Sequence, residues 1–224
     1  MGLKESGLRG SLRSVSTSVI AIPDSAILHI DATQDGRTSG SITSIPDQDG
    51  SLDLSGSAEL VDNGPNGERS YRFDGVDDAM DVAFSSVSQP FTLITVVDPA
   101  TTDTQVHTSG RDGDIAHLSF NNPEHGVHFG DFTNTGINAD AEPQIVIGVI
   151  DGSNSRLRVN GEQIWSGNPG SNPLDGFRIA NDVNLNNAME GDIPESLPCD
   201  GVLPESTIEQ QENRLSDKYA IALV

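Results

Sequence analysis

The sequence contains very little lysine, cysteine and aromatic character. Its 224 residues include two lysines and one cysteine, and aromatic residues make up 4% of the chain. The single cysteine, Cys199, excludes an internal disulfide bond. No run of 18 apolar residues occurs, so no segment is predicted to span a membrane as a helix. Residues 1–23 also lack the apolar stretch that a secretory signal requires, so none is predicted.

Positive charge is scarce as well. The chain carries 12 Lys+Arg against 34 Asp+Glu, for a formal net charge of −22. Such a surface repels a phosphate backbone and an anionic lipid surface, so neither nucleic-acid binding nor membrane insertion is predicted. Molar salt would screen this self-repulsion, since the Debye length is then about 3 Å. High Asp and almost no Lys are typical of proteins from salt-loving archaea; the alternative is an acidic surface protein from ordinary salt.

The charge is unevenly distributed along the chain. Residues 1–23 are rich in Ser and Gly and have a net charge of +2, from Lys4, Arg9 and Arg13 against Glu5. The remaining residues carry nine basic and 33 acidic groups, a net charge of −24. We therefore predict an extended N-terminal docking arm at 1–23, which uses its basic residues to bind a partner chain, and one folded domain at 24–224.

The pattern of residues 24–200 is that of short β-strands. Residues 91–97 and 144–150 are β-branched and apolar on both faces, which predicts buried strands. Asn160-Gly161 predicts a tight hairpin between strands at 156–159 and 162–165. Residues 35–56 are rich in turn signals. The sequence predicts further strands at 26–32, 70–73, 80–83, 115–120, 126–129, 177–180 and 193–197. Ten or so strands at short spacing predict an all-β, two-sheet antiparallel jelly-roll sandwich.

One helix is predicted near the end of the chain, at residues 205–218. Pro204 precedes it, and proline is favoured at a helix start. Ile208, Leu215 and Tyr219 fall on one face of such a helix, and Lys218 lies near its C-terminus, where a cation is favourable.

Several segments together resemble one superfamily. They are SAILHIDA, NGERSYRFDGVDDAMDV, FTLITVVD, IVIGVIDGSNSRLRVNGEQIWSG, GDIPESL and the closing LPESTIEQQENRLSDKYAI. In this order they resemble the laminin-G-like, concanavalin A-like lectin and glucanase superfamily, which implies a two-sheet jelly roll over residues 24–224. The opening GLRGSLRSVSTSVIAIPDS is similar to virion proteins of haloarchaeal tailed viruses.

The resemblance suggests a candidate catalytic strand. Glu190, Asp192 and Glu195 fit the E-x-D-x-x-E pattern with which endoglucanases of this superfamily supply a nucleophile and an acid/base. Pro194 interrupts this strand, and sugar-stacking aromatic residues are scarce. We therefore expect no catalytic residues here and predict that the chain is not an enzyme.

The segment 74–78 offers three carboxylates, from Asp74, Asp77 and Asp78. A hard cation such as Ca²⁺ takes six to eight oxygen ligands, and this segment could supply part of the set. The alternative is a tight turn in which the carboxylates accept hydrogen bonds from backbone amides. No other cofactor is predicted.

Candidate ligand-binding residues lie in the second half of the chain. Trp165 is either a platform for sugar stacking or a packing residue. Asn181 and Asp182 belong to an Asn- and Asp-rich loop that could bind sugar hydroxyls. His125 and His128 are three residues apart, on opposite faces of a strand, so no metal shared with His117 is expected.

These features together favour a virion surface protein of a halophilic archaeal tailed virus, such as a capsid decoration, turret or fibre. We expect it to bind other virion proteins through its arm, to form a homo-oligomer, and to adhere to a host surface glycan or glycoprotein. Two alternatives are a cellular carbohydrate-binding module and a glycoside hydrolase of the same fold.

Overall fold

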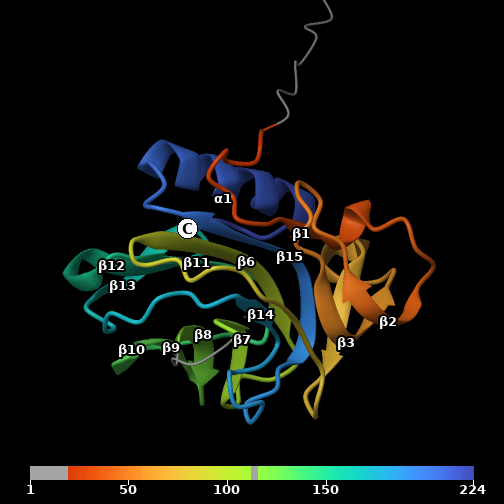
Figure 1. Ribbon diagram of the computed structural model, residues 1–224, viewed down its shortest axis with the longest axis horizontal. Helices are drawn as coiled ribbons and strands as arrows, with labels where there is room; N and C mark the ends of the chain where they lie inside the picture. The colour runs from red at the N-terminus through yellow and green to blue at the C-terminus, as the bar shows by residue number, and fades with distance from the viewer. Residues whose placement is uncertain (1–19, 112–115) are drawn as a thin grey trace, which may run out of the picture.

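The chain folds into fifteen β-strands and one α-helix over the residues that the computed structural model describes, 20–111 and 116–224 (Figure 1). All fourteen pairings between the named strands are antiparallel. The predicted all-β class with a C-terminal helix is confirmed. No helix within these residues is long and apolar enough to cross a membrane. The arm residues Lys4, Arg9 and Arg13 lie outside the described part of the chain.

The strands form one continuous hydrogen-bonded sheet in the order β10-β9-β8-β7-β14-β5-β3-β4-β15-β6-β11-β12-β13, with β1 on β15 and β2 on β3. The first half of this order contains β10 (Phe132–Asn138), β9 (Glu124–Phe129), β8 (Ala116–Asn121), β7 (Gln105–Ser109), β14 (Phe177–Ile179) and β5 (Ala79–Val82). The second half contains β3 (Leu54–Val61), β4 (Ser70–Asp74), β15 (Glu190–Asp200), β6 (Phe91–Pro99), β11 (Gln144–Ile150), β12 (Ser155–Val159) and β13 (Glu162–Gly167). The short strands are β1 (Ile30–Asp31) and β2 (Gly40–Ile45), and the 3₁₀ turns are η1 (Ala32–Gln34), η2 (Pro65–Gly67) and η3 (Gly152–Asn154).

The sheet curls until its two halves face each other across the main core (Figure 1). Thr95 on β6 hydrogen-bonds Thr108 on β7 across this core, with 3.0 Å between the hydroxyl oxygens. A Cβ atom at Gly148 of β11 would lie 2.9 Å from a methyl carbon of Leu118 on β8. The two layers are therefore in direct contact, and their inward side chains make one hydrophobic core.

The helix α1 (Glu205–Tyr219) covers the outer face of β6, β11 and β15 (Figure 1). Its buried residues Ile208, Leu215 and Tyr219 pack in a second apolar cluster with side chains such as Val96 and Ile147. Strands β6 and β11 are consequently buried on both faces, as their apolar sequences predict. The helix ends one residue beyond the predicted boundary.

Residues 20–23, the described end of the predicted arm, contact this helix. The side-chain amide of Gln211 donates a hydrogen bond to the carbonyl oxygen of Ala21 at 2.9 Å. Ile22 packs against the second apolar cluster. Residues 20–23 therefore run along the chain's own helix, while docking of the arm on a partner stays a prediction.

The structure corrects several strand predictions. The turn-rich segment 35–56 contains β2 and the start of β3, and β7 and β10 were not predicted. Within 26–32 only Ile30–Asp31 is a strand, with an isolated bridge from Ala26 to Cys199. The hairpin is confirmed, because Asn160 and Gly161 have φ angles of 50° and 88° and join β12 to β13.

Candidate functional site

A row of charged side chains crosses four neighbouring strands. Glu59 on β3 pairs with Arg72 on β4, Arg72 pairs with Asp192 on β15, and Asp192 pairs with Asp98 on β6. Directly opposite residues of antiparallel strands share a face, with Cβ atoms about 4.5–5.5 Å apart. The neighbours Tyr71 and Phe73 of Arg72 belong to the main core, so the row lies on the other face of the sheet.

This row lines a pocket of about 480 Å³, the acidic pocket. Glu190 and the turn between β4 and β5 form further parts of its wall. Arg72 is the only basic residue among the lining residues that are described. The acidic residues of the pocket are Glu59, Asp74, Asp78, Asp98, Glu190 and Asp192.

Two glycines give the pocket its shape. Gly191 has a φ of +142°, and a Cβ atom there would lie 2.3 Å from the carbonyl oxygen of Asp98. A Cβ atom at Gly75, where φ is +75°, would lie 2.8 Å from the Cβ of Glu190. These positions require glycine, because any larger residue would push β15 away from β6 or the turn away from Glu190.

The charges in the pocket are unequally compensated. The Arg72 guanidinium holds Asp192 through two hydrogen bonds, Nε to Oδ1 at 2.7 Å and Nη2 to Oδ2 at 2.9 Å. Asp98, at the end of the row, has no ion pair within the described residues. Burial, together with the negative charge of Asp192, raises the pKa of Asp98 above its ordinary value. The pocket thus combines Asp192, which Arg72 holds in place, with Asp98, whose carboxyl takes up a proton more readily than usual.

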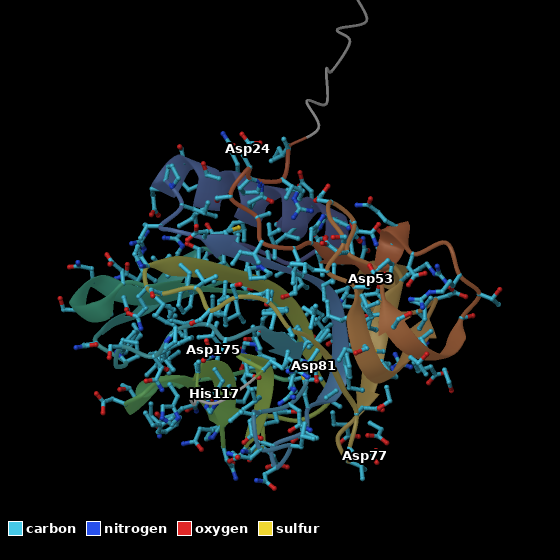
Figure 2. The ribbon with its side chains drawn as sticks, in the orientation of Figure 1. Asp24, Asp53, Asp77, Asp81, His117 and Asp175 are labelled. Carbon is cyan, nitrogen blue, oxygen red and sulfur yellow. The ribbon has the colours of Figure 1, made fainter. Side chains whose placement is uncertain are left out.

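The turn that carries the predicted calcium ligands borders this pocket and lies at the end of the molecule opposite α1 (Figure 2). Asp74, Asp77 and Asp78 have ligand oxygens within 4.8 Å of one another. Asp74 Oδ1 accepts the amide of Val76 at 2.9 Å, and Asp78 Oδ2 accepts the amide of Asp74 at 3.2 Å. Two of the six carboxylate oxygens therefore already stabilise the turn, and calcium binding stays a prediction.

The E-x-D-x-x-E residues do not share one site. Glu190 and Asp192 line the acidic pocket, whereas Glu195 lies under α1. The register between β15 and β6 shifts between Asp192 and Glu195. The shift puts Glu195 opposite Val96, on the outer face of the sheet under α1. Four donors hold its carboxylate there, so it is not available to act with Glu190 on one substrate.

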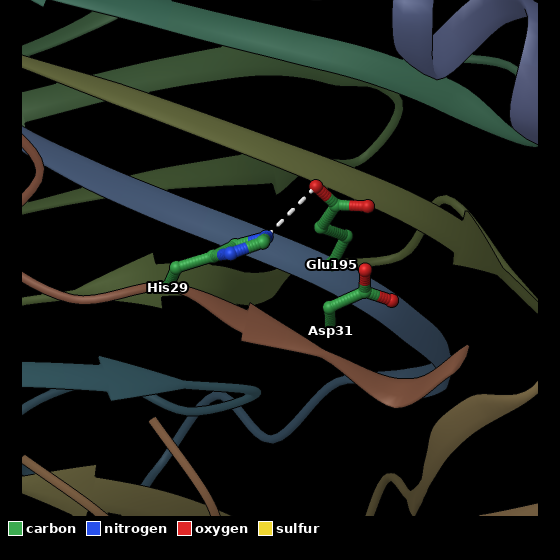
Figure 3. Close-up of side chains that lie close together, drawn as sticks. All are labelled: His29, Asp31 and Glu195. Carbon is green, nitrogen blue, oxygen red and sulfur yellow. Dashed lines mark hydrogen bonds and ion pairs between the residues drawn. The ribbon is translucent and has the colours of Figure 1, made fainter. Parts of the chain in front are cut away.

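Glu195 is instead the centre of a buried ion network, which we call the Glu195 latch (Figure 3). Its side chain is 2% exposed and accepts four hydrogen bonds. The donors are His29 Nε2 at 3.1 Å, an Arg214 guanidinium nitrogen at 2.6 Å, Lys218 Nζ at 2.8 Å and the Tyr219 hydroxyl at 3.0 Å.

The latch also explains a cluster that could be mistaken for a metal centre. His29, Asp31 and Glu195 bring their ligand atoms within 4.8 Å of one another (Figure 3). Lys218 Nζ, however, lies 2.7 Å from Asp31 and 2.8 Å from Glu195. The chain's own ammonium group therefore supplies the positive charge that a metal would supply, and the cluster ties α1 to β1 and β15.

The predicted ligand residues lie away from the acidic pocket. Trp165, on β13, is partly buried and packs against the main core. Asn181 is fully buried and Asp182 is 6% exposed. Asp182 Oδ1 accepts the amides of Asn184 and Asn186, at 3.0 and 2.9 Å. These oxygens shape their own loop, and a ligand role for the three residues stays a prediction.

Two of the histidines, His117 and His128, belong to a second row across the other half of the sheet. His117 and His128 are opposite each other on β8 and β9, with ring centroids 5.1 Å apart. Figure 2 labels Asp81 and His117 along this row. His125 faces the main core beside Phe120, on the opposite face from His128, as predicted. The row comprises Asp81, Arg178, Ser109, His117, His128 and Phe132.

Sequence reasoning missed three residues of the acidic pocket, namely Glu59, Arg72 and Asp98. Arg72 lies between Tyr71 and Phe73, which is the alternation of a half-buried strand, and this signal could have placed it on the open face. Which residues stand opposite one another depends on strand register, which that alternation does not reveal.

No protein-family model matches the chain, and no curated protein matches its sequence. Solved structures do share the fold. The Trypanosoma rangeli sialidase in complex with sialic acid matches at a TM-score of 0.64 and 16% identity, over 88% of this chain and 34% of the sialidase. The chain thus spans about a third of the sialidase's length.

Two further matches are domains of larger proteins. Domain 4 of a GH43 extracellular arabinanase from Geobacillus stearothermophilus, in complex with arabinotriose, matches at a TM-score of 0.60 and 13% identity, over 82% of this chain and 96% of that domain. The binding domain of Paraclostridial Mosquitocidal Protein 1 matches at 0.64 and 14% identity, over 85% and 52% of the two chains. At these identities the likeness establishes a shared all-β fold.

These matches correct one prediction. We expected a chain that is not an enzyme, but its fold is the one found in parts of a sialidase and of a GH43 arabinanase. The prediction rested on interrupted strand geometry and scarce aromatic residues, and those features do not separate this fold from glycosidases. The non-enzyme assignment is therefore wrong and is withdrawn.

Proposed function

We propose that this chain is a carbohydrate-binding β-sandwich domain and that the acidic pocket binds the glycan. The main support is the acidic pocket itself, in which carboxylates and one guanidinium converge on about 480 Å³, room enough for a short oligosaccharide. Carboxylate and guanidinium groups bind sugar hydroxyls as acceptors and donors. Domain 4 of the arabinanase, which holds arabinotriose, shares the fold over nearly its whole length.

The charge of the pocket defines the class of glycan. Six acidic residues face a single arginine, so an anionic sugar would be repelled. We infer that the ligand is a neutral oligosaccharide whose hydroxyls donate to the carboxylates. Glu190 is exposed and forms no hydrogen bond through its side chain within the described residues, so its carboxylate is available to a ligand.

A glycan array tests this proposal with the full chain in molar KCl, comparing wild type with Glu190→Gln. The control is Glu209→Gln, which removes the same charge from an exposed position on α1. We expect neutral oligosaccharides to bind, sialylated ones not to bind, and Glu190→Gln to weaken binding about tenfold or more, because a charged acceptor contributes roughly 1.5–3 kcal/mol. Absence of binding to every neutral glycan would refute the proposal.

A second candidate function, glycoside hydrolysis, is favoured by the carboxyls of the same pocket. Asp98, whose pKa is raised by burial and by Asp192, stands opposite Asp192, which Arg72 holds through two hydrogen bonds. Glycosidases use a pair of neighbouring carboxyl groups, one with a raised pKa to donate a proton and one to accept a proton or stabilise charge. Release of reducing ends from an array-positive glycan by wild type, with loss in Asp98→Asn, would support this candidate, and intact glycan would exclude it.

The finer assignments rest on sequence resemblance. We propose that the strand connections are those of the laminin-G-like jelly roll and that the domain works on the surface of a haloarchaeal tailed virus as a homo-oligomer. Mass spectrometry of purified virions tests this context. Absence of the chain from particles whose genome encodes it would refute the virion assignment and would leave glycan binding untouched.

A further inference from the structure

A second pocket lies where the two halves of the sheet meet, at the end formed by β9, β10, β11 and the β12–β13 hairpin. We call it the hairpin pocket, and its volume is about 190 Å³. None of its lining residues borders the acidic pocket. Pockets for drug-sized ligands occupy about 300–1,000 Å³, so this one has room for a single side chain or a comparable group.

Two buried side chains in the wall of the hairpin pocket lack hydrogen bonds that their chemistry requires. Gln144 is 3% exposed, and its Nε2 donates to the carbonyl oxygen of Asp140 while its Oε1 has no partner. His125 is 2% exposed, and its Nδ1 has no partner. An unpaired buried polar atom costs about 1–3 kcal/mol, so a native structure is expected to satisfy it with water or a ligand.

The charged groups of the wall are all acidic. Asp140, Glu142 and Glu162 line the pocket, and no described basic residue lies within ion-pair distance of them. Every basic residue of the described chain, by contrast, belongs to an ion pair elsewhere. The pocket therefore offers three carboxylates and a carbonyl acceptor without any cation from the described residues.

The rest of the wall is apolar. Ile137, Pro143, Val159 and Ile164 contribute hydrocarbon surface. Burial lowers the pKa of His125 to about 4, so its ring is neutral at pH 7 and adds no positive charge to the pocket. Apolar walls with acceptors and carboxylates match an alkyl stem that ends in a cationic donor.

We propose that the hairpin pocket binds an ammonium or guanidinium group on a short aliphatic stem. The carboxylates attract the cation, Gln144 Oε1 accepts one of its N–H groups, and the apolar wall packs on the stem. A neutral group of the same size lacks the charge and the additional donors, so it binds more weakly. The same chemistry occurs in free amines and in lysine or arginine side chains, including those of this chain's residues 1–19.

Two-dimensional NMR of the full chain in 0.1 and 2 M KCl tests this, with ethylguanidinium and n-butylammonium as probes and n-butanol as the neutral control. We expect saturable shifts at the amides of residues 140–144 and 160–164 with both cations, and at least tenfold weaker binding of n-butanol. Glu162→Gln should weaken cation binding several-fold and Glu209→Gln should not. Equal binding of n-butanol, or no saturable shifts with either cation, would overturn the proposal.

The source of the cation is distinguished by a charge variant of the same chain, Lys4→Gln/Arg9→Gln/Arg13→Gln. If these residues occupy the hairpin pocket, the variant binds ethylguanidinium more tightly than wild type, and amides 140–144 shift without any probe. If the ligand is an external amine, wild type and variant bind the probe equally. Both results support a pocket that binds a cation. The first assigns the occupant to Lys4, Arg9 or Arg13, and the second excludes these residues. If Gln144→Leu folds normally and binds the probe as tightly as wild type, then Gln144 takes no part in binding the cation.

Discussion

The Glu195 latch is the feature whose loss should most weaken the attachment of α1. Glu195→Gln keeps the size of the side chain and removes its charge. Arg214 and Lys218 then lose their anionic partner while they remain only 17% and 21% exposed. Removing one member of a buried pair costs about 3–5 kcal/mol. Lys218 keeps Asp31 at 2.7 Å, so we expect the lower end of that range, about 3 kcal/mol.

The assay is urea-induced unfolding monitored by circular dichroism, supported by calorimetry. For a chain of this length 1 kcal/mol shifts Tm by about 2–4 °C, so Glu195→Gln should lower Tm by about 6–12 °C. Glu209→Gln removes an equal charge from the exposed face of α1 and should change stability by less than about 0.5 kcal/mol. Because the pair is buried, the difference between the variants should persist in molar salt. Equal stabilities of the two variants would refute the reasoning.

The same network predicts a pH dependence. Burial alone would raise the pKa of Glu195, but the hydrogen bond from His29 and the charges of Arg214 and Lys218 outweigh it and hold the pKa well below its usual range. The stabilisation is therefore complete above the carboxyl's ordinary pKa, about 4.3, and is lost as pH falls below it. In Glu195→Gln this part of the acid sensitivity should disappear.

Four further predictions follow from single features. Burial lowers the pKa of His107 to about 3, so the free energy of unfolding should fall as pH drops below about 6.5, where the unfolded histidine takes up a proton. His117, His125 and His128 contribute in the same direction, so His107→Phe should reduce this slope by one histidine's share, and an unchanged slope would contradict the assignment. Gly191→Ala should destabilise by at least about 2 kcal/mol in urea unfolding, while Gly36→Ala, with nothing within 4 Å of the new Cβ, should not. Asp98→Asn should raise Tm at pH 7, with a gain that shrinks as pH is lowered, because the folded state raises the pKa of Asp98. With a net charge of −22, Tm should rise steadily from 0.1 to 2 M KCl, and a flat salt dependence would remove the halophilic interpretation.

The fold class was predictable wherever one physical signal dominated. Residues 144–150 are apolar throughout and became β11 with the predicted boundaries. The Asn160-Gly161 pair can adopt positive φ angles, so its hairpin was predictable from two residues. The predicted helix was correct within one residue because Pro204 sets its start and its apolar face repeats at helical spacing.

The strands that were missed lack such signals. β10 is an edge strand with a mostly exposed, polar sequence, so no apolar alternation marks it. β2 and β3 contain Gly and Ser, which also signal turns, and their pairing with each other and with β4 and β5 is what makes them strands. Pairing with neighbouring strands determines that these segments are strands, and the local sequence does not encode that pairing.

The candidate site was only partly predictable for a related reason. Glu190, Asp192 and the turn at 74–78 were singled out for separate chemistries, and the fold brings them into one pocket. Their partners Arg72 and Asp98 come from strands whose register is a property of the whole sheet. The register shift within β15 places Glu195 in the Glu195 latch, and no sequence pattern predicted that shift.

The most direct test of carbohydrate binding in the acidic pocket is isothermal titration calorimetry, in 2 M KCl, with the neutral oligosaccharide that the array binds best. Wild type and Glu209→Gln should bind with equal affinity, and Glu190→Gln should bind about tenfold or more weakly, because its carboxylate accepts from the ligand's hydroxyls. Equal affinity of all three proteins would place the glycan outside the acidic pocket and contradict the central claim.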